Sequence, residues 1–208
     1  KATGCNARVH AAALADLDAV RKIVPAAEQA FGRLDILVNA AGDTDRGTIF
    51  DTSPQLYARI MAATLTAPFF LIQDAATLMR KQGIQGSIVN IQSMSAHGGQ
   101  PFLAAYSVSK GALATLTRNA AYGLLSDRIR VNGLNIGWMA TPGEDAIMRL
   151  RHGAEDGWLD KAAAGQPFGR LIDPREVAKA VAYLASAESG LMTGANIDFD
   201  QTILGAHD

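Results

Sequence analysis

Three short apolar runs, rich in β-branched residues, lie at 34–39, 86–91 and 129–136. Each is bounded by glycine or small polar residues, which is typical of strands buried in a parallel sheet. Two further runs, at 8–12 and 195–199, are weaker strand candidates. The pattern therefore predicts at least three buried strands.

Between these runs, apolar residues recur at the three- and four-residue spacing of an amphipathic helix. Asp16 is placed to cap the first of these helices and Gly32 to end it. Ser53 followed by Pro54 is a cap and a first-turn proline at the start of the second helix. The pattern predicts helices over 16–32, 53–82, 105–125 and from 173 onward.

Strands that alternate with helices predict an α/β fold: a Rossmann-like, doubly wound and mostly parallel sheet flanked by helices. The sequence contains no internal repeat and no low-complexity linker, so residues 1–208 are predicted to form a single domain. Residues 142–172, rich in glycine and charged residues, interrupt the alternation. Long excursions of this kind are often lids over a site, and we expect a lid-like insertion here.

Composition excludes several classes of function. The 208 residues are 49% hydrophobic and 19% charged, which is sufficient for a sizeable core. A net charge of −1 gives no electrostatic basis for binding nucleic acid or an anionic membrane. The single cysteine, Cys5, fits a reducing compartment. The longest nearly apolar stretch, 60–72, is shorter than the roughly 20 residues that span a bilayer. We expect a cytoplasmic protein.

Small and hydroxyl-bearing residues follow three of the predicted strands. In an open parallel sheet, ligands bind just beyond the carboxyl ends of the strands. Residues at these ends would line one crevice and leave room for a ligand against the backbone. The residues are Asn39, Ala40, Ala41 and Gly42, then Ser93 and Ser95, then Gly137 and Thr141.

Tyr106 and Lys110 are four residues apart in a predicted helix, so both side chains lie on one face. A phenol with an ordinary pKa of about 10 is a poor base at neutral pH. A nearby ammonium favours the phenolate, and lowering the pKa by about three units takes roughly 4 kcal/mol. Tyr106 can then exchange a proton while a hydride moves at the neighbouring carbon. Taken alone, the pair is weak evidence for this chemistry, and the start of an ordinary amphipathic helix is the favoured interpretation.

Together these residues resemble the short-chain dehydrogenase/reductase family, over essentially the whole chain. Ser93, Tyr106 and Lys110 match its catalytic serine and Tyr-x-x-x-Lys pair at the usual spacing. Three further segments are similar to family motifs: 39–42 to Asn-Asn-Ala-Gly, 136–141 to Pro-Gly-x-x-x-Thr, and 169–194 to its C-terminal end. A combination of motifs is far more specific than any one of them.

The resemblance implies NAD or NADP as cofactor and assigns roles to residues. Tyr106 would be the general acid/base, Ser93 would hold the substrate oxygen, and Lys110 would lower the tyrosine pKa and hold the nicotinamide ribose. Thr64 stands where the family has an asparagine whose carbonyl holds a relay water. The implied cofactor contacts are Asn39, Ala40, Ala41, Gly42, Tyr106, Lys110, Ile136, Gly137, Met139 and Thr141. The implied substrate contacts are Ser93, Ser95, His97 and Trp138.

The chain departs from the family pattern in several places. The Gly-rich turn Thr-Gly-x-x-x-Gly-x-Gly is absent from the sequence, so we expect roughly 40 residues with two more strands to precede it in the full protein. Thr64 replaces the relay asparagine, but Pro68 has no N–H to bond its carbonyl, so the relay is expected to be weakened rather than lost. The remaining departures are Ala13 for aspartate, Ile136 for proline, and Gln201-Thr202 for two glycines.

The expected function is the NAD(P)-dependent interconversion of a secondary alcohol and a ketone. A polyol or sugar-like substrate is preferred because polar residues of the insertion accompany Trp138: Glu144, Asp145, His152 and Asp156. A ketoacyl-type or small-ketone reductase is the next candidate, and a catalytically impaired binding or structural relative is the contrasting class. Histidines and carboxylates show no metal-ligand spacing, so no metal is expected. The resemblance implies a homodimer or homotetramer formed through the helices at 53–82 and 105–125 and the C-terminal strand.

Overall fold

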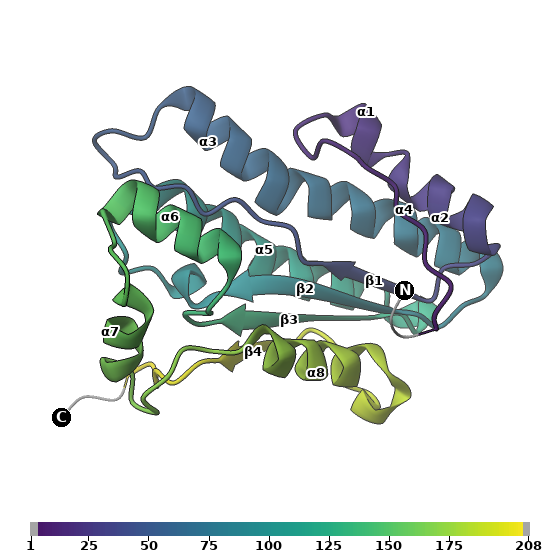
Figure 1. Ribbon diagram of the computed structural model, residues 1–208. Coiled ribbons are helices and arrows are strands. Elements are labelled where there is room, and N and C mark those ends of the chain that lie inside the picture. Colours follow the sequence, from purple (N-terminus) through teal and green to yellow (C-terminus); the bar gives the residue numbers. More distant parts are fainter. Residues whose placement is uncertain (1–3, 206–208) are drawn as a thin grey trace.

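The computed structural model describes residues 4–205 and contains one parallel sheet of four strands in the order β1-β2-β3-β4 (Figure 1). The strands are β1 (Ile36–Asn39), β2 (Ser87–Ser93), β3 (Arg130–Ile136) and β4 (Asn196–Phe199). All three strong strand predictions and the weaker one at 195–199 are confirmed. Because every pair is parallel, the strands end at one edge of the sheet.

Helices connect the strands and cover both faces of the sheet, which confirms the α/β prediction. Helices α4 and α5 pack on one face, against Ile88 and Val131, and α8 packs on the other, against Val89 and Leu134. The helices are α1 (Leu17–Val20), α2 (Ile23–Phe31), α3 (Pro54–Met61), α4 (Ala67–Gln82), α5 (Ala104–Gly123), α6 (Pro142–His152), α7 (Trp158–Ala164) and α8 (Pro174–Ala185). Short helical turns are η2 (Met94–His97), η3 (Leu125–Asp127) and η4 (Ala187–Ser189).

Two predictions near the N-terminus are wrong. Residues 8–12 form no strand and are largely exposed; Val9 is 98% exposed. The helix predicted over 16–32 is instead two helices, α1 and α2. Pro25 explains the break, because it has no N–H to offer the carbonyl four residues earlier and its ring crowds that carbonyl. Asp16 does cap α1, accepting from the amides of Asp18 and Ala19.

The long helix predicted over 53–82 forms, but its middle is the π-helical segment η1 (Ala62–Thr66), which joins α3 to α4. The apolar stretch at 60–72 alone is too short for a bilayer, yet the whole of Pro54–Gln82 is long and apolar enough to cross one by length and composition. A helix of a soluble core meets the same criterion. Here Leu71, Ala75 and Met79 pack into the cluster beside the sheet.

The insertion at 142–172 is largely helical. Thr141 caps α6 by accepting from the amide of Glu144. In Figure 1, α6 and α7 lie at the end of the sheet toward which the strand arrows point. The insertion therefore stands at the carboxyl ends of the strands.

Candidate active site

Ser93 ends β2 and Tyr106 lies in the first turn of α5, and the fold brings their side chains into a hydrogen bond. Both residues are 8% exposed. Lys110 lies one turn further along α5, with its Nζ 5.5 Å from the centroid of the Tyr106 ring. This ammonium donates to the carbonyl of Ile91 on β2 at 2.7 Å. The three side chains predicted to carry the chemistry are therefore adjacent.

The site is buried, and burial dominates its electrostatics. Burial raises the pKa of Tyr106 to about 12, while the hydrogen bond with Ser93 acts in the opposite direction. The charge of Glu144 raises this pKa further and that of Arg46 lowers it. Burial also lowers the pKa of Lys110 to about 8. Among the described residues, no hydrogen bond joins the Lys110 ammonium to the Tyr106 phenol. Further positive charge near the phenol is therefore needed to lower its pKa enough for the phenolate to form at neutral pH.

The loop after β1 and the π segment approach Lys110 from the other side. A Cβ on Gly42 would meet Lys110 Nζ and the methyl of Thr64, each at 3.9 Å. Thr64 is fully buried and its hydroxyl donates to the carbonyl of Ile60 at 2.5 Å. π segments inside α-helices are frequent at functional sites, and this one lies where Pro68 interrupts the hydrogen-bond ladder. Gly42, Thr64 and Lys110 thus share one small region.

A row of buried polar side chains lies between the sheet and α5 and supports the site. Asn39 donates to Asn90 at 2.8 Å, and Asn90 donates to Thr117 on α5 at 2.9 Å. Gln92 donates to Thr117 and to Asn196 on β4, each at 2.8 Å. These bonds fix α5, and so Tyr106, relative to β1, β2 and β4.

The residues predicted to contact substrate fall into different surroundings. Ser95 bonds to Ser93 and to Gln100, and so helps to orient the loop beside Ser93. His97 contacts β4, with its Nε2 3.0 Å from a carboxylate oxygen of Asp198. Trp138 lies at the rim, 36% exposed, and its indole donates to Glu144 at 3.0 Å while its ring lies beside Trp158.

The residues predicted from the segment after β3 are mostly tied into the structure. Ile136 is buried, and Met139 packs against the same cluster and pairs with Ile172. A Cβ on Gly137 would lie 1.8 Å from a carboxylate oxygen of Asp200, so a larger residue there would require the Asp200 side chain to move. Ala40 and Ala41 lie in the loop between Asn39 and Gly42, outside any helix or strand.

Sequence reasoning missed Arg46, which links the loop after β1 to α6. Its guanidinium donates to His152 at 3.0 Å and to Glu144 at 3.2 Å, and it lies over the ring of Phe102. The neighbouring Asp45 accepts from Arg59 and from Arg151, each at 2.7 Å. No local pattern signals these contacts, because the partners on α6 are about 100 residues away in the sequence.

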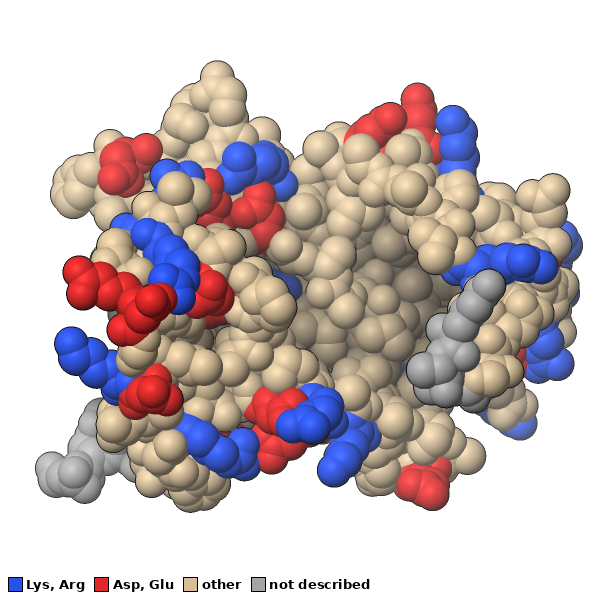
Figure 2. All heavy atoms as spheres, viewed as in Figure 1, with Lys and Arg blue, Asp and Glu red and all other residues tan. Residues whose placement is uncertain are grey.

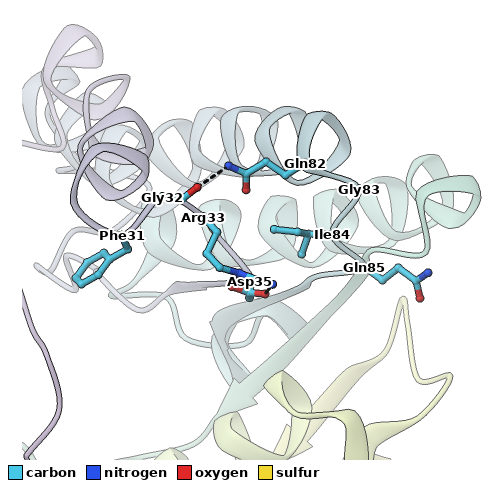
Figure 3. Close-up of a pocket in the computed structure, with 8 residues that line it drawn as sticks. All are labelled: Phe31, Gly32, Arg33, Asp35, Gln82, Gly83, Ile84 and Gln85. Carbon is cyan, nitrogen blue, oxygen red and sulfur yellow. Dashed lines mark hydrogen bonds and ion pairs between the residues drawn. The ribbon is translucent and has the colours of Figure 1, made fainter.

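A surface pocket lies at the opposite end of the sheet, away from Tyr106. It is lined by Phe31, Gly32, Arg33, Asp35, Gln82, Gly83, Ile84 and Gln85 (Figure 3). These residues precede β1 and β2, and the Gln82 amide donates to the carbonyl of Gly32 there. Because ligands of parallel sheets bind at the carboxyl ends, the pocket is not the candidate active site. Residues 4–205 also contain no cluster of three or more metal-ligating side chains.

Comparison with known proteins identifies the relatives of the chain. The family model described as "Enoyl-(Acyl carrier protein) reductase" matches residues 1–202. An uncharacterized oxidoreductase of Thermotoga maritima is 38% identical over 86% of this chain and 70% of its own. An L-rhamnose 1-dehydrogenase (NAD(P)(+)) of Azotobacter vinelandii is 32% identical over 89% of this chain and 71% of its own. The crystal structure of an NAD+-bound xylitol dehydrogenase superposes with a TM-score of 0.85 at 28% identity, covering 96% of this chain and 80% of that one.

Proposed function

Because the chain belongs to the short-chain dehydrogenase/reductase family, we propose that Ser93, Tyr106 and Lys110 are the groups with which it interconverts a secondary alcohol and a ketone. The enzyme is an oxidoreductase that uses NAD or NADP. The observation that carries the residue assignment is the convergence of a serine hydroxyl, a phenol and an ammonium at the carboxyl end of β2.

Tyr106 exchanges the proton of the substrate hydroxyl, acting as base in alcohol oxidation and as acid in ketone reduction. Ser93 donates to the substrate oxygen and stabilises the negative charge that develops on it. Lys110 supplies positive charge next to the phenol. Pro68 leaves the Thr64 carbonyl without the usual donor four residues later, so we expect a relay water there.

The residues around Lys110 fit a dinucleotide. The buried ammonium has three protons and one described acceptor, the carbonyl of Ile91, so two donors remain for the hydroxyls of a ribose. Gly42 keeps the adjoining backbone free of a side chain. The bound nicotinamide supplies hydride transfer and, when oxidised, a positive charge that favours the phenolate. The other proposed cofactor contacts are Asn39, Ala40, Ala41, Ile136, Gly137, Met139 and Thr141.

A polyol or sugar-like alcohol is the proposed substrate class. The relatives that support it are the rhamnose dehydrogenase and the xylitol dehydrogenase. In this chain, the substrate would lie near Ser95 and Trp138, beneath α6. His97 stays a proposed contact only for a substrate that extends toward β4, since it lies beside Asp198.

Assembly and location are proposals as well. Apolar and aromatic side chains are exposed along α4 and α5: Phe69 is 45% exposed, Val108 57% and Tyr122 81%. Exposed apolar surface on two long helices favours a homodimer or homotetramer formed through them. The relatives support a soluble protein, and the composition favours the cytoplasm.

The first test is turnover of a panel of secondary alcohols with NAD+ and NADP+, together with fluorescence titration of NADH and NADPH. The proposal expects one reduced cofactor to bind at micromolar concentrations and at least one alcohol to be oxidised. Binding of neither cofactor would instead support the catalytically impaired alternative. Reduction of ketoacyl thioesters with no alcohol oxidation would support the reductase alternative.

A further inference from the structure

An ion pair closes the space between the loop after β1 and α6. Arg46 Nη2 lies 3.2 Å from Glu144 Oε1, and the two side chains are only 13% and 15% exposed. Trp138 donates to the same oxygen of Glu144 at 3.0 Å. His152 and the carbonyl of Thr44 accept from Arg46 at 3.0 and 2.6 Å. The pair is therefore held from several sides and largely withdrawn from water.

Backbone hydrogen bonds connect the loop that carries Arg46 to the start of the helix that carries Tyr106. Gly47, next to Arg46, donates to the carbonyl of Phe102 at 2.9 Å and accepts from the amide of Ala104 at 3.0 Å. Ala104 begins α5, two residues before Tyr106. The charges of both Arg46 and Glu144 also act on the Tyr106 phenol. In Figure 2, charged side chains of both signs gather over α6 and α7, beside the hollowed face of the molecule.

Each partner keeps hydrogen-bonding capacity that the described contacts do not use. Glu144 Oε1 accepts both of its bonds, and Oε2 has no hydrogen-bond partner among residues 4–205. Arg46 donates through three of its five N–H groups, so two remain. The pair therefore offers one acceptor and two donors close to the phenol that would take the substrate proton.

A hydroxyl group matches this arrangement better than a charged group does. A hydroxyl both donates and accepts, so it can bond to Glu144 and Arg46 together without disturbing their charge balance. A carboxylate would be attracted by Arg46 but repelled by Glu144. An ammonium would be attracted by Glu144 but repelled by Arg46. The pair thus discriminates by charge as well as by hydrogen bonding.

We propose that Arg46 and Glu144 together form a specificity site that holds a second, uncharged hydroxyl of the substrate. This inference rests on the proposed function, since it places that hydroxyl relative to the carbon that reacts beside Tyr106. The substrate class is accordingly a neutral polyhydroxy alcohol, not a hydroxy acid or an amino alcohol.

Three four-carbon ligands test the proposal, because they share the same secondary alcohol and differ only at the far carbon. The far carbon bears a hydroxyl in butane-1,3-diol, is a methyl group in butan-2-ol and belongs to a carboxylate in 3-hydroxybutyrate. Their dissociation constants are measured by NMR titration of the protein in the presence of NADH or NADPH. Hydrogen bonds to charged groups predict that the wild type binds the diol about tenfold more tightly than either analogue.

Variants separate specificity from structure. Glu144→Gln should weaken diol binding about tenfold and bind 3-hydroxybutyrate at least about fivefold more tightly than the wild type does, because the charge of Arg46 is then unbalanced. Arg46→Met should lose the diol preference without gaining the acid. Glu144→Asp keeps the charge and should keep the preference for the diol. Arg149→Gln on α6, whose partners Asp145 and Asp156 are surface carboxylates, is the control and should change none of the three affinities.

Two results overturn the proposal: a wild type that binds the three ligands equally, or a Glu144→Gln variant that weakens all three alike with no gain for the acid. The second result would assign the pair a purely structural role. Thermal unfolding of each variant verifies that it is folded. If the wild type shows the predicted order of affinities but oxidises no alcohol with either cofactor, the proposed function fails and the specificity site stands.

Discussion

Lys110 is a charged group that the fold holds in a buried place, and replacing it by methionine should stabilise the protein. The residue is 3% exposed, and burial lowers its pKa from an ordinary value of 10.5 to about 8. The unfolded chain therefore binds a proton more tightly than the folded chain does. At about 1.4 kcal/mol for each pH unit between these two values, keeping the ammonium charged at pH 7 costs the folded state about 3 kcal/mol.

Methionine is similar in length to lysine and has no charge, so Lys110→Met removes this cost. It also leaves the Ile91 carbonyl without its donor, which costs about 1 kcal/mol. The variant should therefore be about 2 kcal/mol more stable at pH 7, equivalent to about 4–8 °C in Tm for a chain of 208 residues. It should have lost most of its activity, a stability–activity trade-off typical of functional sites.

The stability difference between Lys110→Met and the wild type should depend on pH. Because the folded pKa is lowered, the unfolded state binds more protons between pH 8 and 10.5, and the stability of the wild type rises with pH in that window. By pH 9.5 the cost of the buried charge falls to about 1 kcal/mol, and the advantage of Lys110→Met should nearly vanish.

Urea unfolding followed by circular dichroism at pH 7 and pH 9.5 measures the difference. Lys179→Met, the same substitution at an exposed lysine of α8, is the control and should change stability by less than about 0.5 kcal/mol at both pH values. Two results would contradict this reasoning: a Lys110→Met protein less stable than the wild type at pH 7, or a difference in unfolding free energy that does not change with pH. Either would show that burying the ammonium does not destabilise the folded state.

Other substitutions test the support of the site. Asn90→Ala should cost about 1–3 kcal/mol in urea unfolding, because it leaves the Asn39 amide unpaired inside the protein and removes one of the two donors to the Thr117 hydroxyl. Gly133→Ala should cost about 1–3 kcal/mol, since the new methyl would lie 2.1 Å from the Gln92 amide; Gly123→Ala, in open space at the end of α5, is its control. Burial raises the pKa of Asp45, but bonds from Arg151, the Arg46 amide and Arg59 outweigh it and lower this pKa to about 2. The stability that Asp45 adds is present above pH 4 and lost toward pH 2, so wild type and Asp45→Asn should converge in acid unfolding over that range.

The strands and the placement of Tyr106 and Lys110 on one helix face were predictable from the sequence because their causes are local. A β-branched run between glycines forms a buried strand wherever it pairs, and Tyr106 and Lys110 share a helix face because four residues make about one turn. The failed strand at 8–12 shows the limit of this reasoning, since a strand also needs a neighbour. The break between α1 and α2 has a local cause in Pro25, but the apolar stripe continues through the proline, so the spacing of apolar residues alone predicts one continuous helix.

The contacts that shape the substrate side of the site are not local, and the sequence analysis could not find them. Arg46 and His152 are 106 residues apart, and they meet only because α6 returns across the ends of the strands. Glu144 stands in the first turn of α6, but Thr141 caps that helix and leaves the Glu144 carboxylate to Arg46 and Trp138. The burial that raises the pKa of Tyr106 likewise depends in part on Ile60 of α3, which packs in the same cluster although it lies 46 residues earlier in the sequence.

The account depends most on Tyr106 as the group that exchanges the proton with the substrate oxygen. The decisive measurement is the rate of NAD(P)H formation by Tyr106→Phe and by the wild type, with the best alcohol of the panel and with cofactor affinity measured in parallel. The account predicts that kcat falls at least about a hundredfold while cofactor affinity stays within about threefold, because phenylalanine keeps the ring and removes only the hydroxyl. A Tyr106→Phe enzyme that keeps more than a third of the wild-type kcat would contradict it.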